Sequence, residues 1–132
     1  MAADRLEIVR RTADYWNRRA WSEMEAVLDS DVTVVPPAGW PEGDTIRGWP
    51  EWKRQIERLK DSWEEEHVEV HDITPVGDRV LVKYVWTTRG KDSGIPFETP
   101  MWTLFTFRDG TIARMEYFME ESPALEAARA RE

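Results

Sequence analysis

The chain has 132 residues, of which 41% are hydrophobic and 33% are charged, and its formal net charge is −8. This length supports one domain with one core, and the composition is that of a folded protein. No apolar run approaches the ~20 residues of a membrane span, and Met1 to Arg11 lacks a signal-like pattern, so we expect a cytoplasmic chain without a membrane partner. Because the net charge is negative and basic residues are interleaved with acids, we expect no nucleic-acid partner. With no cysteine, the chain has neither disulfides nor a thiolate metal site.

Helical periodicity predicts three helices in the first half of the chain. Residues 4–18 carry apolar side chains at spacings of three and four. A second, short helix is predicted to begin at Ser22, because the sequence Ser-Glu-Met-Glu is typical of a capping box. The clearest helix has a charged face opposite a stripe of five apolar residues. These are Trp49, Trp52, Ile56, Leu59 and Trp63.

Between the second and third helices, residues 32–35 predict a short strand. The loop from Pro36 to Gly43 follows, with Trp40 at its tip. Its proline and glycine content excludes a helix or a central strand, so we expect it to lie over the surface or over the mouth of a pocket.

From His67 onward the hydrophobic period changes to two, which predicts four consecutive antiparallel strands. They span residues 68–75, 79–89, 97–108 and 111–119. Gly77-Asp78 and Asp109-Gly110 supply hairpin turns, and the second pair is a strong signal for a type I′ turn. A short alanine-rich helix is predicted from Ser122-Pro123.

This order of elements, with helices first and strands later, predicts an α+β fold. We expect a strongly curved, mostly antiparallel sheet wrapped around three helices to form a cone-shaped barrel that encloses a pocket. Residues 1–132 then form a single domain, since neither a repeat nor a linker interrupts them.

Several local strings occur at fixed places in this order of elements. They are Tyr15-Trp16-Asn17-Arg18, Leu28-Asp29-Ser30-Asp31-Val32, Pro37-Ala38-Gly39-Trp40-Pro41-Glu42-Gly43, Arg47-Gly48, Gly77-Asp78-Arg79-Val80 and Arg108-Asp109-Gly110-Thr111-Ile112. Together they resemble the nuclear transport factor 2-like (NTF2-like) superfamily, and within it the SnoaL-like, polyketide cyclase-like domains, over nearly the whole chain. The resemblance implies the cone fold with its pocket and favours a homodimer. That superfamily includes isomerases, cyclases, epoxide hydrolases, dehydratases and proteins that only bind a ligand. The resemblance therefore does not choose among these activities.

Motifs for several other chemistries are missing. The sequence has no GxSxG elbow, no phosphate loop, no dinucleotide fingerprint and no HExxH zinc helix, so we expect no cofactor. His67 and His71 have the i, i+4 spacing of a metal pair on a helix, but they fall at the entry to a predicted strand. We therefore expect no metal site. The remaining chemistry is acid–base work by carboxylates, tyrosines, Arg89 or a histidine in a water-poor cavity.

Glu116 is the first candidate for such a carboxylate. It resembles the last-strand position where limonene epoxide hydrolases carry their water-activating aspartate. Those enzymes pair it with an Arg-x-Asp element. The comparable stretch here is Arg89-Gly90-Lys91, with lysine where the acid should be, and Arg89 is the second candidate for a catalytic role. Strand alternation places Glu116 beside Arg114, opposite the apolar residues of the same strand, and so directs it outward. Glu98 is the alternative base if it faces inward.

The chain has eight tryptophans, and their bulk fits either a plain core or an aromatic-walled cavity. We favour the cavity. Its candidate ligand-binding residues are Tyr15, Trp16, Trp40, Trp52, Trp63, Tyr84, Trp86, Met101 and Tyr117.

Neither face of the predicted strand 97–108 is cleanly polar. Met101 and Thr103 share one face, whereas Trp102 and Leu104 share the other. We expect the concave side to pack on the helices and the pocket, and the convex side to meet a second copy in a homodimer.

Two functions from different classes follow from these patterns. The first is binding of a small hydrophobic or aromatic molecule with acid–base isomerisation or cyclisation, in which Tyr15 or Tyr84 donates a hydrogen bond to the developing oxyanion. The second is a non-catalytic ligand-binding or dimeric interaction module. An epoxide hydrolase-like activity is a further alternative.

Overall fold

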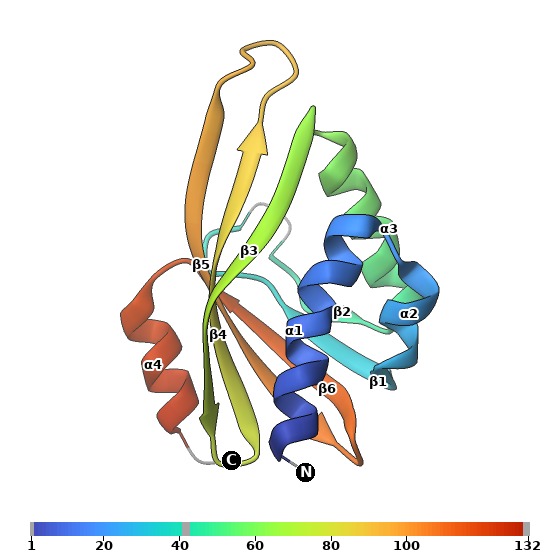
Figure 1. The fold of residues 1–132 in the computed structure, drawn as a ribbon, viewed down its shortest axis with the longest axis vertical. Helices are drawn as coiled ribbons and strands as arrows, with labels where there is room; N and C mark the ends of the chain where they lie inside the picture. The colour runs from blue at the N-terminus through green and yellow to red at the C-terminus, as the bar shows by residue number, and fades with distance from the viewer. Residues whose placement is uncertain (1, 41–42, 131–132) are drawn as a thin grey trace.

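The computed structural model describes residues 2–40 and 43–130. Pro41 and Glu42, which belong to the predicted loop, lie outside the described residues. In chain order the elements are α1 (Ala2–Arg18), α2 (Trp21–Ala26), β1 (Leu28–Val35), β2 (Ile46–Arg47), α3 (Trp49–Asp61), β3 (Glu65–Val76), β4 (Arg79–Arg89), β5 (Pro96–Arg108), β6 (Thr111–Phe118) and α4 (Glu121–Arg129) (Figure 1).

The strands form one open, six-stranded sheet in the order β2-β1-β6-β5-β4-β3. The meander β3 to β6 is antiparallel throughout, as predicted, and β1 joins it in parallel beside β6. Helices α1, α2 and α3 cover one face of the sheet, and α4 lies on the other face (Figure 1). The α+β fold with a curved sheet around three helices is therefore confirmed.

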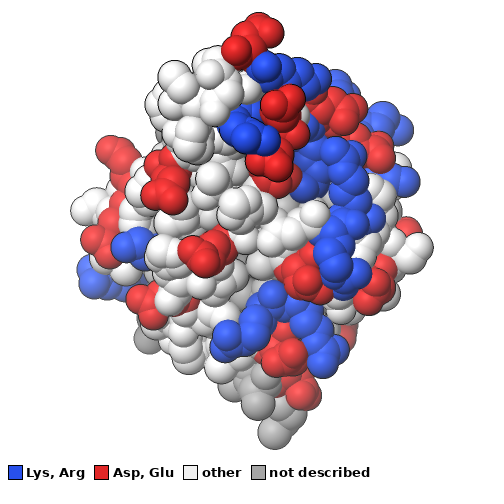
Figure 2. All heavy atoms as spheres, turned by 45° about the horizontal axis from the view of Figure 1, so that its top comes forward, with Lys and Arg blue, Asp and Glu red and all other residues white. Residues whose placement is uncertain are grey.

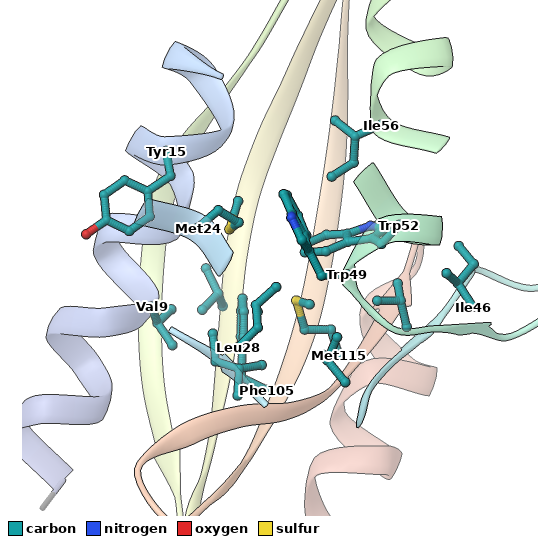
Figure 3. Close-up of a cluster of buried hydrophobic side chains, with 14 of the residues drawn as sticks. Val9, Tyr15, Met24, Leu28, Ile46, Trp49, Trp52, Ile56, Phe105 and Met115 are labelled. Atoms are coloured by element: carbon teal, nitrogen blue, oxygen red, sulfur yellow. The ribbon is translucent and has the colours of Figure 1, made fainter. Parts of the chain in front are cut away.

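The main core lies between the concave face of the sheet and the three helices. In Figure 3, Trp49 and Trp52 of α3 occupy its centre, with their rings edge to face at 5.7 Å between centroids. Val82 and Phe105 reach this core from β4 and β5. Phe105 has the strand parity of Met101 and Thr103, so that face of β5 is the inner one.

A second, smaller core lies on the convex face. There Ala124 and Ala128 of α4 pack against Leu81, Trp102 and Leu104 of the sheet. We had expected this face to meet another subunit. The tail helix of the chain itself covers part of it.

Two local predictions had different outcomes. Asp109 and Gly110 both have positive φ, at 53° and 84°, as the predicted type I′ turn requires. The capping box at Ser22 is wrong, because α2 begins one residue earlier, with Ala20 at its N-cap and no side-chain cap hydrogen bond.

Asn17, near the end of α1, fixes this helix against the edge of the sheet. Its amide donates to the Val68 carbonyl at 2.9 Å and accepts from the Val68 N–H at 2.8 Å. Since β3 is an edge strand, these bonds pair backbone groups that the sheet leaves open. The side chain that precedes Asn17, Trp16, is thereby held at the entrance to the space between α1 and the sheet.

The surface has mixed charge. On the face drawn in Figure 2, basic and acidic side chains are interleaved rather than gathered into a field of one sign. Among the described residues, no helix combines the length and the apolar character needed to cross a bilayer.

Candidate functional site: an aromatic cavity on the concave face

A cavity of about 480 Å³ opens between α3, the sheet and the loop that follows β1. This volume lies within the range of roughly 300–1,000 Å³ that is common for small-molecule sites. Five strands (β1, β2, β4, β5 and β6), helices α1 and α3, and the loop all contribute residues to its wall. They are Trp16, Val34, Pro36, Pro37, Trp40, Ile46, Trp52, Gln55, Ile56, Arg58, Leu59, Ser62, Tyr84, Trp86, Met101 and Tyr117.

Aromatic rings make up much of this wall. Trp40 reaches back from its loop to Trp86 on β4, with 6.4 Å between the ring centroids. The prolines before Trp40 prevent this loop from forming a helix. The side chains of Pro36, Pro37 and Trp40 lie against the cavity. We expected this loop either over the surface or over a pocket mouth, and its described part lies at the cavity.

Two tyrosines place hydroxyl groups in the wall. Tyr84 and Tyr117 come from β4 and β6, and the hydroxyl of Thr103 on β5 donates a 3.0 Å hydrogen bond to the Tyr84 oxygen. Burial raises the pKa of Tyr84, and burial followed by the nearby Tyr84 raises the pKa of Tyr117 well above its usual value. Both phenols are therefore neutral hydrogen-bonding groups at physiological pH.

A smaller cavity of about 70 Å³ adjoins the first on the inner side. The two share Trp16, Trp52, Tyr84 and Tyr117 as walls. The hydroxyl-bearing tyrosines thus stand between an outer chamber and a narrower one that reaches Met115 and Phe105 in the core.

A buried ion pair lies behind the wall. Lys60 of α3 bonds the carboxylate of Glu66 on β3, and each side chain is only 3% exposed. Burial lowers the pKa of Lys60, while the hydrogen bond from its ammonium to Glu66 opposes that effect. The other carboxylate oxygen of Glu66 accepts hydrogen bonds from the indole N–H groups of Trp16 and Trp86, at 2.8 and 2.9 Å.

Sequence analysis missed Lys60 and Glu66, although the sequence carries a signal for each. Lys60 continues the buried stripe of α3 one turn after Ile56. Glu66 shares its strand parity with Val68 and Val70, the half-buried residues of β3. A lysine and a glutamate at inward positions of adjacent elements indicate a buried pair.

The model of the SnoaL-like domain family matches residues 9–115 of the sequence. The chain belongs to this family. None of the curated protein sequences matches the SnoaL-like chain significantly.

Solved structures with the same fold cover nearly all of the SnoaL-like chain. A protein from Catenulispora acidiphila DSM 44928 with a ketosteroid isomerase-like fold, crystallised with trimethylamine, is 25% identical over 95% of this chain and 94% of that one, with a TM-score of 0.75. TerC, co-crystallised with polyporic acid, is 19% identical over 96% and 99% of the two chains, with a TM-score of 0.79. An NTF2-like protein from Burkholderia pseudomallei K96243 is 18% identical over 96% and 98%, also with a TM-score of 0.79. The predicted membership of the NTF2-like superfamily is confirmed.

Most of the aromatic residues singled out from the sequence of this SnoaL-like domain line the cavity. These are Trp16, Trp40, Trp52, Tyr84, Trp86, Met101 and Tyr117. Tyr15 and Trp63 do not line it. Tyr15 is buried at the edge of the main core, and Figure 3 shows its hydroxyl directed away from the other labelled side chains. Trp63 follows the end of α3, contacts Trp86 edge to face, and borders a polar cleft.

The three residues singled out for catalysis also lie outside the cavity wall. Glu116 stands on the convex side of β6, with its carboxylate 3.3 Å from Arg114. Glu98 is exposed on β5, on the same side as Trp102. Arg89, at the end of β4, pairs with Glu65 at 2.7 Å. The structure therefore brings none of them together with the aromatic wall.

The histidines have the backbone conformation that the sequence predicted. His67 and His71 belong to β3 rather than to a helix, and His71 sits at a bulge in the pairing with β4. Within residues 2–40 and 43–130, no group of three acidic or histidine side chains could hold a metal ion.

Proposed function

We propose that this SnoaL-like domain binds a small, largely apolar, aromatic molecule that carries a hydrogen-bonding oxygen. The observation that carries the proposal is the cavity of about 480 Å³ with its indole and phenol walls. Rings of this kind favour planar partners, because stacked and edge-to-face contacts add to the free energy of apolar burial. The curved sheet, rather than a mobile surface loop, supplies Tyr84, Trp86, Met101 and Tyr117 to the wall.

The tyrosines favour a ligand oxygen at the inner end of the cavity. Because Tyr84 accepts the hydrogen bond from Thr103, its own proton is available for an acceptor inside the cavity. A carbonyl or ether oxygen supplies such an acceptor, whereas a purely apolar ligand would leave the proton of the buried Tyr84 hydroxyl without one. We therefore favour ketones, quinones and phenolic ethers over hydrocarbons.

The geometry favours ligand binding without acid–base catalysis by a carboxylate or a histidine. No Asp, Glu or His is among the described residues that line the cavity. An isomerase, a cyclase or an epoxide hydrolase of the type considered from the sequence uses a carboxylate or imidazole beside the substrate. Glu116 and Glu98 point to the other side of the sheet, so we propose that they take no part in this site.

The test is calorimetric titration of the protein with a panel of planar aromatic ketones, polyketide-like aromatics, steroids and terpenoid epoxides. Polyporic acid and trimethylamine, the compounds present in the two similar crystal structures, complete the panel. We expect saturable binding of an aromatic ketone or quinone. No saturable binding by any aromatic member of the panel would contradict the proposal.

A matched pair of variants on α3 locates the binding site. Leu59 lines the cavity, whereas Arg54 is exposed elsewhere on the helix. Leu59→Trp fills the space that the ligand needs, so affinity should fall at least about tenfold. Arg54→Trp adds the same side chain outside the cavity and should bind normally. Equal affinity in both variants would place the ligand elsewhere.

We also propose that the domain forms a homodimer through the convex side of the sheet. Helix α4 covers only part of this side. The apolar side chain of Ile95, in the connection between β4 and β5, is 57% exposed. Light scattering at micromolar concentration should give twice the mass of one 15.5 kDa chain. The mass of a single chain would contradict the dimer without affecting the binding proposal.

A further inference from the structure

The carboxylate of Glu66 joins four elements behind the aromatic wall. Its Oε1 accepts hydrogen bonds from Trp16 Nε1 of α1 and from Trp86 Nε1 of β4, at 2.8 and 2.9 Å. Its Oε2 accepts from Lys60 of α3. Glu66 itself comes from β3, so one buried side chain connects two helices and two strands at the same point.

This arrangement satisfies a charge that would otherwise be costly to bury. A carboxylate removed from water needs an opposite charge and hydrogen-bond donors to offset the lost hydration. Lys60 supplies the charge, and its ammonium also lies 5.0 Å from the centre of the Trp16 ring. The indole N–H groups supply the donors, so the position of Glu66 and the orientation of both indoles depend on each other.

The position of Glu66 also decides which part of each indole faces the cavity. Trp16 and Trp86 line the cavity, but Glu66 does not. Glu66 and Lys60 instead border a polar cleft of about 430 Å³ on the other side. Because both N–H groups donate toward Glu66, the two indoles present carbon surface, and no donor, to a ligand.

The neighbouring tryptophan gives a contrast. Trp63 packs edge to face on Trp86 at 6.1 Å, yet its buried Nε1 has no hydrogen-bond partner among the described residues. Trp86 itself contacts both Trp63 and Trp40. A rotation of Trp86 would therefore disturb three of the rings around the site, and the bond to Glu66 opposes that rotation.

We propose that Glu66 is the positioning residue of the cavity: it fixes the indoles of Trp16 and Trp86 so that this end of the wall is an apolar surface and recognition of the ligand's oxygen falls to Tyr84 and Tyr117. The part of this inference that concerns the ligand rests on the proposed function. The part that concerns the indoles does not, because it applies to the unliganded protein.

Two double variants separate hydrogen bonding from charge. Lys60→Met with Glu66→Gln removes both charges and keeps an amide oxygen as acceptor for the indoles. Lys60→Met with Glu66→Leu removes both charges and the acceptor. Neither variant leaves a buried charge unpaired, so the comparison isolates the hydrogen bonds.

The first measurement needs no ligand. In ¹H–¹⁵N spectra, the indole N–H groups of Trp16 and Trp86 should exchange with solvent slowly in the wild-type protein and in the glutamine variant. In the leucine variant their exchange should be at least about tenfold faster, because residue 66 no longer accepts a hydrogen bond that keeps the indole N–H groups away from solvent. Equal exchange rates in the two double variants would overturn the inference.

The second measurement is affinity for the best aromatic ligand from the panel. The glutamine variant should bind it at least about tenfold more tightly than the leucine variant, since only the former keeps the wall in place. Equal affinities would overturn the role of Glu66 in the site. If the wild-type protein binds no ligand, the proposed function fails, and the exchange measurement still decides whether Glu66 fixes the indoles.

Single variants keep the inference testable if the leucine variant does not fold. Trp16→Phe and Trp86→Phe each remove one donor and keep an aromatic ring. In each case the remaining indole should stay protected from exchange, because it still donates to Glu66. Rapid exchange of the remaining indole in both variants would overturn the inference.

Discussion

Thr103 donates a 3.0 Å hydrogen bond to the phenolic oxygen of Tyr84, across the adjacent strands β5 and β4. Thr103 is 2% exposed, so water does not compete for this bond. The bond fixes which way the Tyr84 proton can point. It therefore connects a residue of the core to the hydrogen bonding that the cavity offers a ligand.

Thr103→Val tests this connection, because valine has nearly the shape of threonine and lacks the donor. We expect the free energy of unfolding to fall by about 1 kcal/mol. Affinity for a carbonyl-bearing ligand should fall by roughly three- to tenfold, since the Tyr84 hydroxyl becomes free to turn away. Urea denaturation and calorimetry measure the two effects. Thr87→Val, on the other face of β4, is the matched control and should change ligand affinity little.

The two cavity tyrosines predict how the protein responds to alkaline pH. Burial raises the pKa of Tyr84 and of Tyr117 above the value of about 10 that a tyrosine has in an unfolded chain. Above pH ~10 the unfolded chain therefore binds fewer protons than the folded one, and the free energy of unfolding falls as pH rises. Below that pH both states keep these protons, and the contribution is constant.

Phenolate absorbance during an alkaline titration measures the ionisation of the tyrosines directly. While the protein stays folded, only part of the absorbance change of its three tyrosines should appear near pH ~10. The rest should appear together with unfolding. Tyr84→Phe and Tyr117→Phe should each reduce the part of the absorbance change that appears with unfolding. Complete titration near pH ~10 in the folded protein would contradict the burial of these phenols.

Lys60→Met should be among the most destabilising single changes in the described part of the chain. It leaves the Glu66 carboxylate, whose side chain is 3% exposed, with no ammonium partner. Removing one member of a buried ion pair typically costs about 3–5 kcal/mol of stability. Lys53→Met, on the same helix and without a buried partner carboxylate, is the control. Similar unfolding midpoints for the two variants would show that the pair is solvated.

The meander was predictable from the sequence because its period is local. The bounds of β4 match the prediction, and Asp109-Gly110 forms the expected turn. The start of β1 was missed because Asp29, Ser30 and Asp31 are polar, so the strand predicted from the sequence begins only at residue 32. In the structure they belong to a strand whose pairing with β6 shifts register between Leu28 and Thr33. Strand β2 has only two residues, too few to show a period.

Parts of the site that depend on the alternation of side chains along a strand were predictable from the sequence. Parts that depend on contacts between residues far apart in the sequence were not. Alternation gives Tyr84 and Trp86 one face of β4, and in the structure both line the cavity. Alternation also gives Glu66 the parity of the half-buried Val68 and Val70, but it gave no information on the partner of Glu66, Trp16, which lies fifty residues away in the sequence. Trp63 follows the periodicity of α3, yet the helix ends at Asp61, and this ring contacts Trp86 without lining the cavity.

The last prediction concerns the carboxylates that the sequence suggested for catalysis. Glu116→Gln and Glu98→Gln should leave ligand affinity within about twofold of wild type, because both side chains lie on the far side of the sheet from the cavity. Tyr84→Phe should weaken binding of the same ligand by about tenfold, since it removes a donor from the wall. If the ligand is also turned over, both glutamine variants should keep the full rate. A loss of turnover in Glu116→Gln with unchanged affinity would contradict the binding-only proposal, because a residue can affect the chemical step in this way only if it reaches the reacting atoms or controls a group that does.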